Sequence, residues 1–199
     1  MSASNVVIIA NGGANIASLQ FALQRLGTTS AVSANARKIR EASHVILPGV
    51  GAAGDAMSRL RQMNLDTLIP SLRQPVLGIC LGMQLLFEAS EEGAAQCLGI
   101  ISGRAVRLAC DSEHPVPHMG WNTLKFERPN ALLDGLRQDD YAYFVHSYAL
   151  PLGSATIASS EYGGSFSACV QWKNFFGAQF HPERSAKVGA RLLQNFLCL

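Results

Sequence analysis

The sequence lacks the features that mark several specialised classes of protein. It has no Cys-x-x-Cys pair, no cluster of Lys or Arg, no secretory signal at its start and no apolar stretch of the ~20 residues that a membrane span needs. The formal net charge of +2 is too small to indicate binding to nucleic acid. The five cysteines form an odd set, so we expect no disulfide framework, no metal site and a reducing compartment, the cytoplasm.

The composition that is present is that of an ordinary globular protein. Hydrophobic residues make up 48% of the 199 positions and charged residues 15%. A chain of this length can bury a substantial core, and no internal repeat or linker divides it. We therefore expect a single domain over residues 1–199.

The first part of the chain alternates between short apolar runs and helical periodicity. Asn15 is the expected N-cap of the first helix and Gly27 its C′ residue. The alternation predicts a parallel, doubly wound α/β sheet, in which active sites lie beyond the carboxyl ends of the strands. The predicted strands are 5–10, 28–32, 44–47 and 76–79, and the predicted helices are 16–26, 34–42, 53–62 and 66–72.

The second part of the chain changes from this alternation to a series of strands joined by short turns. Strands are predicted at 104–108, 120–126, 141–148, 156–162, 166–172 and 175–179, and a closing helix at 185–198. The fold class we expect is therefore α/β, with a doubly wound, mostly parallel sheet and additional antiparallel strands in the C-terminal half.

Cys80 lies at the join between a predicted strand and a helix predicted to start over 83–88. Gly78 and Gly82 flank it at two residues on either side, a G-x-C-x-G pattern typical of the strand-to-helix turn called a nucleophile elbow. Such a turn exposes the sulfur and directs backbone N–H groups of the helix towards it, which favours the thiolate. The alternative is that Cys80 is a buried and inert small hydrophobe.

His181 is the histidine best placed to serve a cysteine nucleophile as a base. It follows the predicted strand 175–179 and stands two residues before Glu183, which could hold the imidazole while its other nitrogen faces the sulfur. The alternative is a capped helix start with a solvated glutamate. His146 is equally expected to line the pocket or to have a structural role. The remaining three histidines are expected to be structural or solvated, namely His44, His114 and His118.

The stretch Gly49-Val50-Gly51 follows a predicted strand at the same edge of the sheet. Its backbone N–H groups, together with the N–H of Leu81, could stabilise an oxyanion. The alternative is that the stretch is simply a turn.

Together these residues resemble the class I (triad-type) glutamine amidotransferases. The resemblance rests on Gly-Ile-Cys-Leu-Gly-Met-Gln at 78–84, Phe-His-Pro-Glu at 180–183 and Leu-Pro-Gly-Val-Gly at 47–51. Within that class, the stretches 117–122 (Pro-His-Met-Gly-Trp-Asn), 143–148 and 174–185 are similar to the glutaminase subunit of imidazole glycerol phosphate synthase. The likeness extends from Val6 to the C-terminus.

The resemblance implies a Cys80–His181–Glu183 triad that hydrolyses L-glutamine to glutamate and ammonia without a cofactor or metal. It implies that the ammonia passes to a (β/α)₈-barrel cyclase subunit in a heterodimer that serves histidine biosynthesis. Gly49, Val50, Gly51 and Leu81 would form the oxyanion site. The substrate would be held by Gln84, His146, Ser147 and Tyr148, and the partner would be met by Met119, Trp121, Asn122, Tyr143 and Arg184.

Two positions depart from the family's pattern, since Ala10 stands where an Asp is common and Arg184 where some members have Lys. Two other functions stay open at this point. One is a class I glutaminase that supplies a different synthase, such as those for anthranilate or GMP. The other is a non-catalytic scaffold, which the presence of Cys80, His181 and Glu183 disfavours.

Overall fold

The computed structural model describes residues 5–12 and 16–199 of the chain. The N-terminal part consists of β1 (Val6–Ile9), α1 (Ile16–Arg25), β2 (Ser30–Ser33), α2 (Ala36–Glu41), β3 (His44–Gly49), α3 (Ala53–Gln62), α4 (Leu65–Leu68), β4 (Val76–Cys80) and α5 (Leu81–Leu85). The C-terminal part consists of β5 (Phe87–Ser90), β6 (Ala95–Gln96), β7 (Ile101–Arg107), β8 (His118–Thr123), β9 (Lys125–Phe126), β10 (Tyr141–His146), β11 (Tyr148–Ala149), β12 (Thr156–Glu161), β13 (Ser165–Trp172), β14 (Phe175–Ala178) and α6 (Ala186–Phe196).

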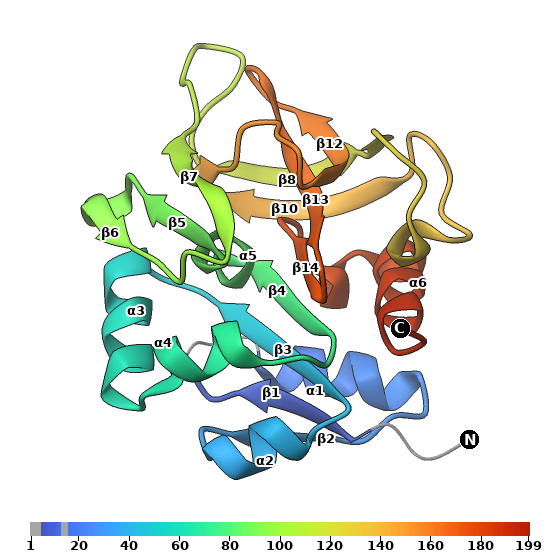
Figure 1. Ribbon diagram of the computed structural model, residues 1–199. Helices are drawn as coiled ribbons and strands as arrows, with labels where there is room; N and C mark the ends of the chain where they lie inside the picture. The colour runs from blue at the N-terminus through green and yellow to red at the C-terminus, as the bar shows by residue number, and fades with distance from the viewer. Residues whose placement is uncertain (1–4, 13–15) are drawn as a thin grey trace.

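A mixed eight-stranded sheet forms the centre of the molecule, in the order β2-β1-β3-β4-β14-β13-β12-β9 (Figure 1). Strands β2, β1, β3, β4 and β14 run parallel, and β13, β12 and β9 continue the sheet in antiparallel pairs. The predicted α/β fold class, with its antiparallel C-terminal addition, is thereby confirmed. The last strand of the chain, β14, lies between β4 and β13 inside the sheet.

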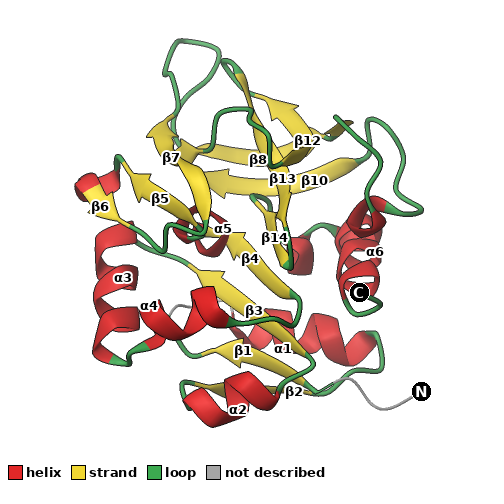
Figure 2. Cartoon of the chain, in the orientation of Figure 1, coloured by secondary structure: helices red, strands yellow, loops and turns green. Residues whose placement is uncertain are grey.

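Both faces of the parallel half are buried, which explains why its strands are apolar at successive positions. In β1, Val6 and Ile8 face one core, and Val7 and Ile9 face the other. Helices α1 and α6 contribute to the first core, while α2, α3 and α4 contribute to the second (Figure 2). None of the helices among the described residues is long and apolar enough to cross a bilayer.

Two smaller sheets lie beside the main one. Strands β8 and β10 form an antiparallel pair, and β11, β7, β5 and β6 form a four-stranded sheet. The predicted strands 120–126 and 141–148 are each divided, at Leu124 and at Ser147. At the first break, the N–H of Leu124 bonds to the carbonyl of Asp140 at 3.0 Å instead of continuing a ladder.

Helix α5 is shorter than the sequence predicted. The expected helix over 83–88 ends at Leu85, and Phe87 begins β5. The carbonyls of Leu86 and Phe87 accept hydrogen bonds from Ile101 and Gly99, at 3.0 and 2.8 Å, and Phe87 is buried in the core. The prediction was wrong because pairing with a more distant segment overrides local periodicity.

The predicted helix over 66–72 is divided into α4 and a 3₁₀ turn over Ile69–Ser71. The C′ position of Gly27 after α1 is confirmed, since its φ of +75° is one that glycine adopts without strain. The expected N-cap Asn15 lies outside the described residues.

Candidate active site

Cys80 is the last residue of β4, where the chain turns into α5 with almost no room. Its backbone has φ 53° and ψ −113°, a conformation that a side-chain-bearing residue rarely adopts. A Cβ added to Gly82 would lie 1.8 Å from the carbonyl oxygen of Leu47, and one added to Gly78 would lie 2.6 Å from the carbonyl oxygen of Gly82. The two glycines of the G-x-C-x-G pattern are therefore required by the closeness of the backbones, as the elbow interpretation predicted.

Gly49 belongs to the close approach between β3 and α5 and not to the loop that follows β3. It is the last residue of β3, in register with Cys80, and an added Cβ would lie 2.6 Å from the N of Gly82. Val50 and Gly51 come after the strand and line the cavity in front of the sulfur. Of the predicted oxyanion stretch, the structure thus places two residues at the cavity and one beneath the elbow.

His181 follows β14, the strand that pairs in parallel with β4, and this pairing brings it to Cys80. Its N–H donates to the carbonyl of Tyr143 at 3.0 Å, which fixes the backbone. Its Nδ1 lies 2.9 Å from Oε1 of Glu183, whose side chain is only 3% exposed. Because a carboxylate only accepts, Nδ1 donates and Nε2 is the nitrogen left for the sulfur.

The charge on His181 follows from these two neighbours. Burial lowers the pKa of His181, but the hydrogen bonds and charges of Cys80 and Glu183 outweigh burial and raise it to about 10. These two neighbours therefore favour the imidazolium form of the ring. The structure brings the predicted Cys80, His181 and Glu183 together as one hydrogen-bonded group.

A cavity of about 280 Å³ opens in front of the sulfur. All four residues that the resemblance implies for substrate binding line this cavity, as does Leu81 of the expected oxyanion site. The lining residues are Val50, Gly51, Cys80, Leu81, Gln84, Glu92, Pro117, Val145, His146, Ser147, Tyr148 and His181. In the part of the chain that the structure describes, no group of three or more His, Cys, Asp or Glu side chains could hold a metal ion.

Two residues of the site were missed by sequence reasoning. The carboxylate of Glu92 lines the cavity and accepts from the N–H of Ala53, the first residue of α3, at 2.8 Å. Gln179 is fully buried, and its Nε2 lies 3.7 Å from the Cys80 sulfur. No local pattern marks Glu92, but Gln179 stands two residues before His181, a spacing that indicates the same side of an extended chain.

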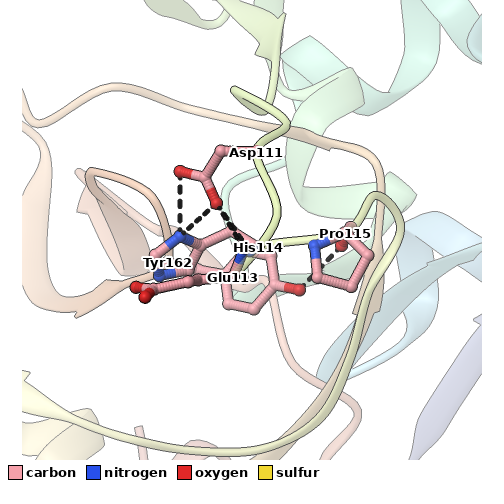
Figure 3. A network of polar contacts seen from close by, with 5 residues as sticks. All are labelled: Asp111, Glu113, His114, Pro115 and Tyr162. Carbon is pink, nitrogen blue, oxygen red and sulfur yellow. Dashed lines mark hydrogen bonds and ion pairs between the residues drawn. The ribbon is translucent and has the colours of Figure 1, made fainter.

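The three histidines expected to be structural or solvated lie outside the triad. His118 opens β8, is 3% exposed and stacks on the ring of Tyr162. The loop before it is held as Figure 3 shows, since His114 Nδ1 contacts the carboxylate of Asp111 at 3.0 Å and the Tyr162 hydroxyl donates to the carbonyl of Pro115 at 2.7 Å. His44 is buried at the start of β3, and burial lowers its pKa.

One face of the β8–β10 pair is apolar and exposed. Met119 and Trp121 are 63% and 52% exposed, and Tyr143 lies directly across from Trp121, with its ring 5.8 Å away. Arg184 is exposed, and Asn122 is half-buried. Trp121 is therefore a surface residue, and the exposed face adjoins the cavity through Val145, which pairs with Met119.

Comparison with known proteins gives this site a family context. The model described as "Glutamine amidotransferase class-I" matches residues 7–199. The chain is 49% identical over 199 residues to imidazole glycerol phosphate synthase subunit HisH of Vibrio cholerae, covering 97% of this chain and 98% of that protein. It is 50% identical over 194 residues to imidazole glycerol phosphate synthase subunit HisH 2 of Legionella pneumophila, covering 98% of each.

The fold has relatives among solved structures as well. The structure of PurLQS from Thermotoga maritima superposes with a TM-score of 0.78 at 18% identity, covering 98% of both chains. At that identity the similarity concerns the fold alone.

Proposed function

We propose, because the chain belongs to the class I glutamine amidotransferase family, that it is the glutaminase subunit of a cytoplasmic imidazole glycerol phosphate synthase. It hydrolyses L-glutamine to glutamate and ammonia, and the ammonia passes to the cyclase subunit of histidine biosynthesis. The observation that carries the proposal is that Cys80 and His181 meet at one cavity while Glu183 holds Nδ1 of His181. The relatives at about half identity over nearly the full chain favour this synthase over those for anthranilate or GMP.

Cys80 is the proposed nucleophile. Its thiolate, paired with the imidazolium of His181, attacks the side-chain amide carbon of glutamine. The oxygen of that amide becomes an oxyanion, for which the N–H groups of Leu81 and of the Val50–Gly51 segment are the nearest candidates on the cavity wall. Gly51 has φ +86°, a left-handed conformation that leaves its N–H free of a regular strand.

His181 acts as an acid when the thioester forms and as a base when the thioester is hydrolysed. Its Nε2 proton goes to the departing nitrogen, the C–N bond breaks, and ammonia leaves a γ-glutamyl thioester on Cys80. Water then attacks the thioester carbon while His181 takes the water's proton, and glutamate is released. Glu183 keeps Nδ1 protonated and stabilises the positive ring in both steps.

The remaining cavity wall suits the amino-acid end of glutamine. The Glu92 carboxylate offers a negative charge to the α-ammonium group, and the Ser147–Tyr148 backbone offers polar atoms beside it. Gln84, expected to bind the substrate, lines this cavity, and its Nε2 donates to the carbonyl of Tyr148 at 2.8 Å and to Oε1 of Gln179 at 3.0 Å. These two bonds orient the Gln84 amide in the wall, with its Oε1 as the polar atom left for the substrate.

The exposed face of Met119, Trp121 and Tyr143 is the proposed contact with the cyclase, with Arg184 at its margin. Asn122, also expected at this contact, points to the other side of the strand pair, where its amide donates to the carbonyl of Glu161. The face is apolar and adjoins the cavity, so a partner bound there would close the route from the sulfur to solvent. Free ammonia is mostly ammonium at neutral pH, which is why a closed route is needed.

Glutamine hydrolysis measured with and without the cyclase subunit tests the assignment. We expect the isolated chain to hydrolyse glutamine slowly and the complex to do so about 10²-fold faster, because one unplaced oxyanion donor on the Val50–Gly51 segment costs about that factor. Steady-state kcat for glutamate formation is the measurement. Equal rates with and without the cyclase would contradict activation by the partner, and no hydrolysis in either state would contradict the glutaminase itself.

Exchange of Glu183 for glutamine should separate the effect of its charge on catalysis from the effect of its shape. We expect Glu183→Gln to lower kcat by about 10²-fold with KM little changed, because the amide no longer stabilises the imidazolium. Loss of the anion also favours the neutral ring, so the pKa of His181 falls from about 10, and the alkaline limb of the pH–rate profile moves to lower pH. Glutamate formation by the complex between pH 6 and pH 10 measures both effects, and an unmoved alkaline limb would remove Glu183 from the triad.

A further inference from the structure

The Cys80 sulfur has a neighbour outside the triad. Gln179 is fully buried, and its amide Nε2 lies 3.7 Å from Sγ. The other end of the same amide is fixed, since its Oε1 accepts from Nε2 of Gln84 at 3.0 Å. This hydrogen bond decides which way the Gln179 amide faces, so that its N–H group and not its oxygen is directed at the sulfur.

Gln84 is itself oriented by the next member of a chain of hydrogen bonds. Its Nε2 donates to the carbonyl of Tyr148 at 2.8 Å. The same carbonyl lies 2.9 Å from Nδ1 of His146, which must donate because a carbonyl only accepts. Nε2 of His146 is then left as an acceptor.

The chain continues from the main cavity into the β8–β10 pair. Nδ1 of His118 lies 3.1 Å from Nε2 of His146, and the amide nitrogen of Asn122 lies 3.4 Å from Nε2 of His118. Since the Asn122 nitrogen can only donate, His118 accepts at Nε2 and donates from Nδ1, in agreement with the acceptor left on His146. Burial lowers the pKa of both rings, to about 4 for His118 and about 3 for His146, so each is neutral and needs the one tautomer that the chain supplies.

We propose that Gln179 is a positioning residue for the nucleophilic sulfur and that this continuous chain sets its orientation from the β8–β10 pair. We call the chain, which runs from Asn122 through His118, His146, the Tyr148 carbonyl and Gln84 to Gln179, the amide–histidine relay. The proposal rests on the proposed function of Cys80. It adds a second donor to the sulfur, one that is neutral and independent of His181.

The physical effect is a choice between two partners for the sulfur. As a thiol it can donate to the carbonyl of Val145, which lies 3.6 Å away, whereas as a thiolate it is repelled by that oxygen and stabilised by the Gln179 N–H. A Gln179 amide turned the other way would present a second oxygen to the sulfur. Each member of the relay that fixes its neighbour's orientation therefore favours the reactive form of Cys80.

Site-resolved alkylation measures the reactive sulfur directly. The full-length chain is treated with iodoacetamide between pH 5 and pH 10, and the rate at each cysteine is followed by mass spectrometry of its peptide. In Gln179→Met, which keeps the length and removes the donor, we expect alkylation of Cys80 at pH 7 to slow about tenfold and to recover at high pH. The exposed Cys110 and Cys198 of the same chain are internal references whose rates should not change.

A variant at the far end of the relay tests whether the hydrogen bonds of the relay act as a unit. His118→Phe keeps an aromatic ring between Tyr162 and Phe144 but removes the donor to His146. We expect it to slow Cys80 alkylation about threefold, and to add little to Gln179→Met when the two are combined. Tyr162→Phe is the matched control, because it stacks on the same ring, is not a member of the relay and should match the wild type.

The outcomes separate this proposal from the glutaminase assignment. Wild-type alkylation in Gln179→Met, or in Gln179→Glu should the first variant fold poorly, would overturn the positioning role while glutamine hydrolysis by the wild-type complex stays intact. If Cys80 alkylation is slow in Gln179→Met but proceeds at the wild-type rate in His118→Phe, the part of the relay beyond Tyr148 is overturned. Slower alkylation of Cys110 and Cys198 as well would overturn both the positioning role of Gln179 and the relay, because the effect would then not be specific to the sulfur of Cys80.

Discussion

Exchange of Cys80 for alanine is expected to lower glutamine-dependent turnover of the complex by at least about 10⁴-fold, because no other group in the cavity can form the γ-glutamyl thioester. The same complex should still turn over with added ammonium salt, since the cyclase receives ammonia from solution in place of the glutaminase. Product formation is measured with glutamine and with ammonium in separate assays. The ratio of the two rates is the informative quantity.

The control for this experiment is Cys110→Ala, which removes an exposed thiol outside the site. It should leave both rates at the wild-type level. Loss of the ammonium-dependent rate in Cys80→Ala would show that the variant damages the complex as a whole, and the proposed division of labour between the subunits would then be wrong. Retention of the glutamine-dependent rate would exclude Cys80 as the nucleophile.

The second large effect is expected at Gly82. In Gly82→Ala the new methyl carbon would lie 1.8 Å from the Leu47 carbonyl oxygen. Neither atom can turn aside, because the backbone fixes the position of a Cβ and the oxygen is itself a backbone atom. Strand β3 must therefore separate from α5, and we expect a loss of about 3 kcal/mol or more in the free energy of unfolding, or no folded chain. Urea-induced unfolding followed by circular dichroism is the measurement.

Gly54→Ala is the matched control, because Gly54 lies in α3 with no atom within 4 Å of an added Cβ. That variant should be as stable as the wild type or more stable by up to about 1 kcal/mol, through the better helix propensity of alanine. A Gly82→Ala chain with the wild-type midpoint would contradict the close crossing of β3 and α5. It would also remove the reason for the G-x-C-x-G pattern.

The sequence was sufficient for the parts of the site that depend on local geometry. The glycines around Cys80 indicate a tight turn, and the two-residue spacing of His181 and Glu183 allows their contact. The apolar runs of the parallel strands likewise predict a sheet buried on both faces. Each of these features leaves a pattern within a few residues of the sequence, so it can be predicted from that pattern.

The features that sequence reasoning missed depend on contacts between distant segments. Phe87 was predicted in a helix, but its pairing with Ile101 places it in a strand. For His118 a structural and a solvated role could not be separated, and it is β10 and Tyr162 that bury it. Gln179 carries no catalytic signature of its own. Its place beside the sulfur comes from the pairing of β14 with β4, which the alternation of strands and helices does not specify.

That pairing has a consequence for the order in which the protein becomes active during its synthesis. Ala178 of β14 lies in register with Ile79 of β4 on one side and with Cys169 of β13 on the other, so a segment synthesised after both of its neighbours fills an inner position of the sheet. Until that segment is inserted, a nascent chain carries the Cys80 sulfur without the imidazole of His181 beside it. We therefore expect such a chain to leave glutamine unhydrolysed.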